Sequence, residues 1–342
     1  MEIVWPILVS LHPRSMISRR LVRIKALQAL YSYQQGGNTE TIPVQSVNQS
    51  DQAHYQNTLT ALFDSINQSY DFFLFLLDLP YQLSAYLLEK QALEKSKFYP
   101  DQKKIRDFSI LDRMPLVKYL HRAVEDKKGK HFPFDWSELA GQFDQYYEWM
   151  QSWEFVHDIN IFDAPTFQQQ QAFLEEFYAN LFETKESFFD YLNDYYSGWS
   201  DDELYTTREI EKTIQGSKEN GQVPIPEKPH QQSEEIEMAH QLFTTTCKNS
   251  KLYESQVAEI SDNWDPSRIA IMDLLIIKLT LTEFLHCPTI PVKVTINEYL
   301  EITKNYSTPN SSRFVNGVLD KLRIVMESQG LIHKSGRGLR EK

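Results

Sequence analysis

Apolar residues recur every three or four positions through most of the chain, which is the spacing of one face of an α-helix. The strict alternation of apolar and polar residues that marks a half-buried strand is scarce. This pattern predicts an all-α protein. The expected helices cover residues 18–35, 53–78, 81–97, 113–127, 135–150, 166–182, 184–197, 201–215, 233–248, 250–261, 266–286, 291–304 and 310–328.

Two segments interrupt the helical pattern. The first, from Gly36 to Ser50, is polar and without periodicity, and the second, from Gly216 to Gln232, contains three prolines that exclude a continuous helix. We therefore expect five parts along the chain. They are a poorly ordered or non-native extension (1–17, with Met16 as the natural start), an arginine-rich helix (18–35), an acidic and aromatic helical region with flanking loops (36–232), a C-terminal helical block (233–328) and a basic tail (329–342).

Neither a membrane span nor a stapled or metal-bound scaffold is predicted. The longest apolar run, Phe72 to Leu77, lies between two aspartates and is far shorter than the roughly 18 residues that a spanning helix needs. Cys247 and Cys287 are the only cysteines among 342 residues, and they lack the paired spacing of a zinc site. The composition favours a cytoplasmic protein without a metal or cofactor.

Charge is distributed unevenly. The net charge is −12, yet between Phe134 and Glu211 we count 18 acidic residues against two basic ones, whereas Arg14 to Lys25 holds five basic residues and no acid. The net charge of the whole chain is therefore a poor guide to what its N-terminal part binds.

Three arginines lie at the start of the first predicted helix. Ser18 is a good N-cap, and Arg19, Arg20 and Arg23 follow it within about 100° of one another on the first turns. The N-terminus of a helix also favours anions, so this arrangement suits phosphate binding. A solvated basic helix end would have the same sequence, and this alternative stays open.

The segment 266–286 is apolar around nearly its whole circumference, which predicts a helix at the centre of a bundle. Asp273 and Lys278 are its charged exceptions, so each is expected near a helix end or at an interface. In the last predicted helix, Gly317 should cost about 1 kcal/mol relative to Ala unless close packing of helices uses it.

Three motifs together resemble one known family. The segment RRLVRIKALQALY (19–31), the segment HCPTIPVKVTINE (286–298) and the segment SSRFVNGVLDKL (311–322) look like the bacterial transcription antitermination factor NusB. The resemblance covers residues 18–35 and about 236–325. It implies a NusB-like helical bundle into which the acidic middle region is inserted.

The resemblance also implies a function. NusB-like proteins pair with the ribosomal protein NusE, recognise boxA-like single-stranded RNA in ribosomal RNA transcripts and join an antitermination complex on RNA polymerase. Residues at RNA-contacting positions of the family are Arg19, Arg20, Arg23, Tyr31, Asn310, Arg313 and Phe314, and those expected at the partner protein are Asp273 and Lys278. Members of the family usually carry an acidic residue at the position of Asn310. The asparagine therefore removes a negative charge near the phosphate of the RNA.

Single-stranded RNA is bound by aromatic side chains that stack on bases and by cations that hold phosphates. Phe314 could be such a stacking platform or a core residue, and periodicity alone favours the core. We expect Arg20→Ala and Arg23→Ala each to weaken RNA binding without unfolding the protein.

The sequence is also compatible with two other functions. The acidic middle region could dock a basic protein through aromatic anchors such as Tyr146 and Trp199, or it could pack these side chains into its own core. An accessory domain of an RNA-modifying enzyme is the least favoured reading, because the sequence has no glycine-rich cofactor loop and no HExxH motif. We therefore expect a protein that is not an enzyme.

Overall fold

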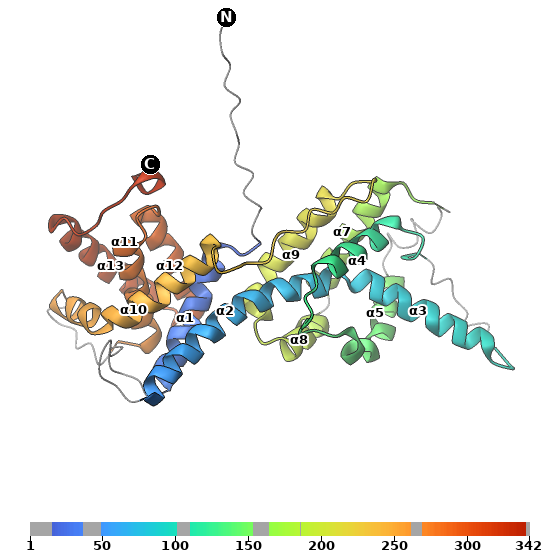
Figure 1. Ribbon diagram of the computed structural model, residues 1–342, viewed down its shortest axis with the longest axis horizontal. Coiled ribbons are helices and arrows are strands. Elements are labelled where there is room, and N and C mark those ends of the chain that lie inside the picture. Colours follow the sequence, from blue (N-terminus) through green and yellow to red (C-terminus); the bar gives the residue numbers. More distant parts are fainter. Residues whose placement is uncertain are drawn as a thin grey trace, which may run out of the picture. The chain divides into compact units, whose positions relative to one another are not determined.

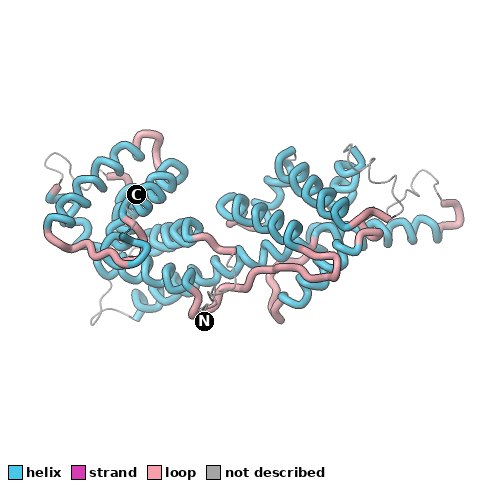
Figure 2. Tube along the Cα trace, turned by 90° about the horizontal axis from the view of Figure 1, so that it is seen from above, coloured by secondary structure: helices cyan, strands magenta, loops and turns pink. Residues whose placement is uncertain are grey.

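The computed structural model describes residues 16–36, 49–100, 110–152, 164–184, 186–260 and 269–339. Over these residues the chain forms helices and no strands, which confirms the all-α prediction (Figure 2). They fall into two compact units. The bundle unit holds residues 17–66 and 229–342, and the insertion unit holds residues 67–228 with Met16.

The bundle unit is built around helix α11 (Ile271–His286). Helices α1 (Arg19–Gln35), α10 (Glu234–Glu259), α12 (Val292–Tyr306) and α13 (Ser311–Ser328) pack against it, and the blue α1 lies among the orange and red helices (Figure 1). Every residue from Leu275 to Phe284 is buried, as expected for a helix that is apolar all round. The sequence therefore correctly predicted the centre of the bundle.

Helix α10 corrects one prediction, because it is a single helix where two were expected to meet near residue 249. Asn249 and Ser250 are only moderate helix formers, but the buried stripe continues through Tyr253 and Val257. Packing thus outweighs the local preference. Helix α11 begins at Ile271, later than the predicted start at residue 266, and Ile269 and Ala270 before it are not helical. Residues 261–268 and residues 1–15 of the predicted extension lie outside the described residues.

The insertion unit contains the last turns of α2 (Gln49–Leu77) and the short 3₁₀ helix η1 (Trp136–Gln142). Its other helices are α3 (Leu79–Ser96), α4 (Pro115–Lys127), α5 (Phe143–Ser152), α7 (Phe167–Thr184), α8 (Glu186–Tyr195) and α9 (Trp199–Gly216). The segment from Ser217 to Ser233 is not helical, in agreement with its three prolines.

Aromatic side chains form the core of the insertion unit. Phe75 stacks on Trp136 with ring centroids 3.9 Å apart, and Phe72 contacts Tyr196 at 4.6 Å and Trp199 at 5.6 Å. Two of the buried polar groups have backbone partners: Trp136 Nε1 donates to the carbonyl oxygen of Phe75 at 3.1 Å, and the Tyr178 hydroxyl donates to that of Leu76 at 2.8 Å. The described aromatic residues of the acidic region therefore serve largely its own core.

The two aspartates that bracket the apolar run are both paired. Asp71 accepts two hydrogen bonds from Lys228 Nζ at 2.6 and 2.7 Å, and Asp78 accepts one from His121 Nδ1 at 2.8 Å.

Among the described helices, none is long and apolar enough to cross a membrane.

Gly317 lies exposed in the middle of α13, and a Cβ placed on it would meet no atom within 4 Å. Gly317→Ala should therefore raise the free energy of unfolding of the bundle unit by about 0.5–1 kcal/mol, because Ala loses less backbone entropy in a helix. Hydrogen exchange across a urea titration would measure this. As a control, Gly338→Ala should destabilise, since its Cβ would come within 2.0 Å of the Pro288 carbonyl oxygen. No gain from Gly317→Ala would mean that the glycine is needed for another reason.

Candidate nucleic-acid interface

The first candidate group is the N-terminal turn of α1. The helix begins at Arg19, and the Ser18 side chain accepts a hydrogen bond from the Leu21 amide at 3.1 Å, as the capping preference predicted. The first turn contains no acidic residue. The three arginines therefore start their helix as expected, but other helices bring carboxylates to each of them.

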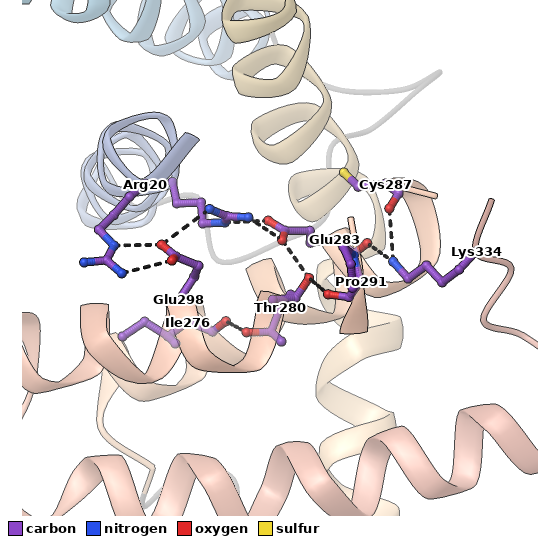
Figure 3. Close-up of polar contacts among 10 residues, drawn as sticks. Arg20, Ile276, Thr280, Glu283, Cys287, Pro291, Glu298 and Lys334 are labelled. Carbon is purple, nitrogen blue, oxygen red and sulfur yellow. Dashed lines mark hydrogen bonds and ion pairs between the residues drawn. The ribbon is translucent and has the colours of Figure 1, made fainter. Parts of the chain in front are cut away.

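Arg19 and Arg20 form partly exposed ion pairs. Arg19 Nη2 lies 3.2 Å from Glu234 of α10, and both side chains are largely in solvent. Arg20 holds Glu298 of α12 with two hydrogen bonds, Nε to Oε2 at 2.7 Å and Nη2 to Oε1 at 2.9 Å (Figure 3). These hydrogen bonds lower the pKa of Glu298, so it remains ionised at neutral pH. The pair contributes stability that is lost in acid, as Glu298 becomes protonated.

Arg23 is buried rather than presented to solvent. Its side chain is 3% exposed and binds Glu283 of α11 through Nε at 2.8 Å and Nη2 at 2.7 Å. Glu283 also accepts a hydrogen bond from the Thr295 hydroxyl at 2.7 Å. Burial alone would lower the pKa of Arg23, but the hydrogen bond to Glu283 and the nearby negative charges raise it. This charge pair ties α1 to the central helix.

The burial of Arg23 changes what we expect of it. A phosphate could reach its guanidinium only by breaking the bond to Glu283, and Arg23→Ala would leave that carboxylate buried without its cation. The expectation that this variant stays folded therefore does not fit the structure. Arg23 Nη1 also lies 3.7 Å from Glu298, so Arg23 helps to place the carboxylate that holds Arg20. We assign it a positioning role.

The second candidate group is the start of α13. Asn310 occupies the N-cap and is exposed, Arg313 is exposed on the first turn, and Phe314 beside it is half-buried. Neighbouring Val315 and Val318 are buried and carry the core side of the helix. A half-buried ring is compatible both with a stacking platform for a base and with a core residue, so both interpretations of Phe314 stay open.

A polar cleft of about 620 Å³ lies between α12 and α13. Two of the predicted residues, Asn310 and Arg313, line it. Sequence reasoning missed its other polar residues, which are Asn297, Glu301, Lys304, Ser312 and Asn316. Their signal is the helical spacing of 297, 301 and 304 on one face of α12.

Helix α12 contributes to both groups, because Glu298 holds Arg20 while its neighbour Asn297 lines the cleft. Tyr31 is 41% exposed on α1. It lies 11 residues beyond Arg20, which is about 16 Å along the helix. Helix α12 therefore contacts the first turn of α1, which carries the arginines, and also lines the α13 cleft. Tyr31 lies further along α1.

The two residues predicted to bind a partner protein are both buried. Asp273, in the first turn of α11, accepts a hydrogen bond from the Ser307 hydroxyl at 2.5 Å. Lys278 is 3% exposed and donates to Ser250 Oγ at 2.7 Å and to Glu254. A central helix needs internal partners for its charges, so neither side chain is presented to a second protein. Their role in partner binding stays a prediction.

The C-terminal tail returns to the end of α11. Lys334 Nζ donates to the carbonyl oxygens of Glu283 and Cys287 at 3.1 and 3.0 Å, where the helix dipole favours a cation (Figure 3).

Burial raises the pKa of the Cys287 thiol to about 11 and that of Cys247 to about 12. Both thiols are therefore neutral near pH 7, unlike a catalytic thiolate.

One group of side chains in the insertion unit has metal-ligating chemistry. Ligand atoms of Asp78, His121 and Glu125 lie within 4.8 Å of one another. The ammonium of Lys128 contacts two of them, at 2.6 Å from Glu125 and 3.5 Å from Asp78. The Lys128 ammonium thus already supplies the positive charge that a metal ion would bring to these carboxylates.

Comparison with known proteins identifies the bundle. The NusB family model matches residues 204–323. The chain is 38% identical to the transcription antitermination protein NusB of Salinibacter ruber over 117 residues, 34% of this chain and 71% of that protein. It is 41% identical to the NusB of Chloroherpeton thalassium over 98 residues, 29% of this chain and 46% of that protein. No solved structure matches the chain.

The matched stretch thus spans about half of the Chloroherpeton protein and more than two thirds of the Salinibacter protein. Most of the insertion unit lies before the matched region, which begins at Leu204 within α9. The all-α bundle, the three sequence motifs and this degree of identity agree with one another. The chain belongs to the NusB family.

Proposed function

We propose that this protein is an RNA-binding transcription antitermination factor. It recognises boxA-like single-stranded RNA together with the ribosomal protein NusE and acts within the antitermination complex on RNA polymerase. The relatives with which it shares up to 41% identity are transcription antitermination proteins by name. The observation that carries the proposal is the polar α12–α13 cleft, where Arg313 and Lys304 lie among amide side chains.

The chemistry of the cleft suits a nucleotide. Amide groups of Asn297, Asn310 and Asn316 offer both donors and acceptors to base edges, and Arg313 offers charge to phosphates. Lys304 is the second cation of the cleft and is paired with Glu301. Asn310, at the N-cap of α13, adds no negative charge to this surface. Half-buried Phe314 next to Arg313 provides an aromatic face on the same turn.

Arg20 supplies a second phosphate contact in this proposal. Its side chain is 39% exposed, and it holds Glu298 with two hydrogen bonds. Glu298 fixes the orientation of the guanidinium, and Arg23 fixes Glu298 from the buried side. The first turn of α1 therefore carries two exposed arginines, Arg19 and Arg20, and one buried support, Arg23, rather than three equivalent cations.

Arg20→Ala and Arg313→Ala should each weaken binding of a boxA-like RNA oligonucleotide, measured by fluorescence anisotropy with and without NusE. Each lost phosphate contact should lower the slope of log affinity against log salt by about 0.7. Arg122→Ala is the matched control, because Arg122 is an exposed arginine on α4 of the insertion unit. Equal affinity and equal salt slope in both variants and the control would refute the assignment.

A further inference from the structure

A groove runs between α7 and α9 of the insertion unit, with a cavity volume of about 540 Å³. Its apolar lining includes Ala172 and Ala179 of α7 and Ile210 and Ile214 of α9. Both alanines are exposed and lie seven residues, or about two turns, apart. Small side chains on one wall leave room for another chain to approach the helix closely.

Carboxylates border this apolar floor on both sides. Glu175 and Glu176 come from α7, and Glu203 and Glu211 come from α9. Arg208 is the only basic residue among the described residues that line the groove. In the described part of the chain, no basic side chain forms an ion pair with any of these four glutamates. Partial burial raises the pKa of Glu203 by disfavouring its charged form, and a cation beside it would offset that effect.

A neighbouring face of α9 is already occupied. Asp202, Thr206, Glu209 and Thr213 point into the insertion unit and are buried there. Ile210 and Ile214, at the base of the groove, are buried as well, so the solvent-facing apolar surface of the groove comes from Ala172 and Ala179 of α7. A groove with such an apolar wall and a border of carboxylates can bind a second helix.

We propose that the α7–α9 groove binds a basic amphipathic helix of a partner protein. The apolar face of that helix lies on Ala172 and Ala179, and its lysines or arginines pair with the bordering glutamates, Glu175 and Glu203 among them. RNA does not fit this surface, because four carboxylates repel phosphate and Arg208 is the single basic residue among the described residues that line the groove. The proposal concerns a second surface and does not depend on the RNA site.

The test uses the full chain and a fluorescent peptide of about 18 residues, with leucines at helical spacing on one face and lysines elsewhere. A peptide of the same composition in shuffled order is the reference. Anisotropy should show tighter binding of the amphipathic peptide. The double variant Glu175→Gln with Glu203→Gln should weaken it about fivefold to tenfold. Ala179→Trp, which keeps every charge but fills the groove, should weaken it at least as much.

The matched control is Glu89→Gln with Glu148→Gln, which removes two exposed charges from α3 and α5 of the same unit. It should change the affinity less than about twofold, a small effect typical of unpaired surface charges. The proposal is overturned if the amphipathic peptide binds no better than the shuffled one, or if the control pair costs as much as the groove pair. It is also overturned if Ala179→Trp leaves the affinity unchanged, or if spermine binds in an Ala179-dependent way and the peptide does not. Circular dichroism of each variant verifies that the helices are intact.

Discussion

Replacing Glu283 by Ala is expected to lower the free energy of unfolding of the bundle unit by about 3–5 kcal/mol. The variant leaves the buried Arg23 guanidinium without its hydrogen-bonded carboxylate, and the Thr295 hydroxyl loses the shorter of its two hydrogen bonds. Both partners are desolvated by the surrounding helices, so water cannot replace the lost carboxylate at low cost. Hydrogen exchange of bundle-unit amides across a urea titration measures the change.

Two controls isolate the buried charge. The double variant Arg23→Met with Glu283→Leu removes both charges and should recover most of the loss, because a buried ion pair and an apolar pair of similar volume are often close in stability. Glu301→Ala breaks the exposed pair with Lys304 and should cost less than about 1 kcal/mol. If Glu283→Ala cost no more than Glu301→Ala, the buried pair would not hold α1 to α11.

Replacing Phe314 by Ala is expected to weaken RNA binding by about 1–3 kcal/mol, with only a small change in stability. The side chain is half-buried on the first turn of α13, while Val315 and Leu319 carry the core contacts. Removing the ring therefore takes away a stacking surface more than it opens a cavity. A thermal melt and an RNA titration on the same preparation measure both effects.

Leu319→Ala is the companion variant for Phe314. Leu319 is fully buried on the same helix, so its truncation should cost about 2–5 kcal/mol of stability and leave RNA affinity of the folded protein unchanged. The same signature from Phe314→Ala, a large stability loss with normal RNA binding, would make Phe314 a core residue and reject the stacking role.

The fold was largely predictable because helical periodicity depends on neighbouring residues. The apolar circumference of residues 271–286 indicated a central helix, and the helix start at Ser18 followed from a local capping rule. The extent of α10 was not predictable in this way. Whether Asn249 and Ser250 end a helix depends on what Lys278 and the other residues of α11 offer across the bundle.

The candidate site was less predictable, because its electrostatics depend on residues far apart in the sequence. The carboxylates that meet Arg19, Arg20 and Arg23 follow them by 215, 278 and 260 residues. One signal was available, since Glu283 is a charged residue in an otherwise apolar helix and such a residue needs a partner. Nothing in the sequence indicated which arginine that partner would be.

In the acidic region, too, some features could be predicted from the sequence and others depend on packing. Its composition correctly indicated many carboxylates and many rings, but only packing could show which of them face inward. The described rings lie largely in the core of the insertion unit, and four glutamates remain around one groove. A count of charges along the chain cannot separate these two outcomes.

The order of the helices has a consequence for synthesis on the ribosome. Helix α1 packs against α10 and α11, yet about 200 residues separate the end of α1 from the start of α10. At about 5–20 residues per second, the apolar face of α1 waits roughly 10–40 s for its partners. Residues 67–228 are complete before those partners emerge, so the insertion unit can fold first. A nascent chain stalled after residue 228 should therefore protect the insertion unit from protease while leaving α1 open to cleavage or to a chaperone.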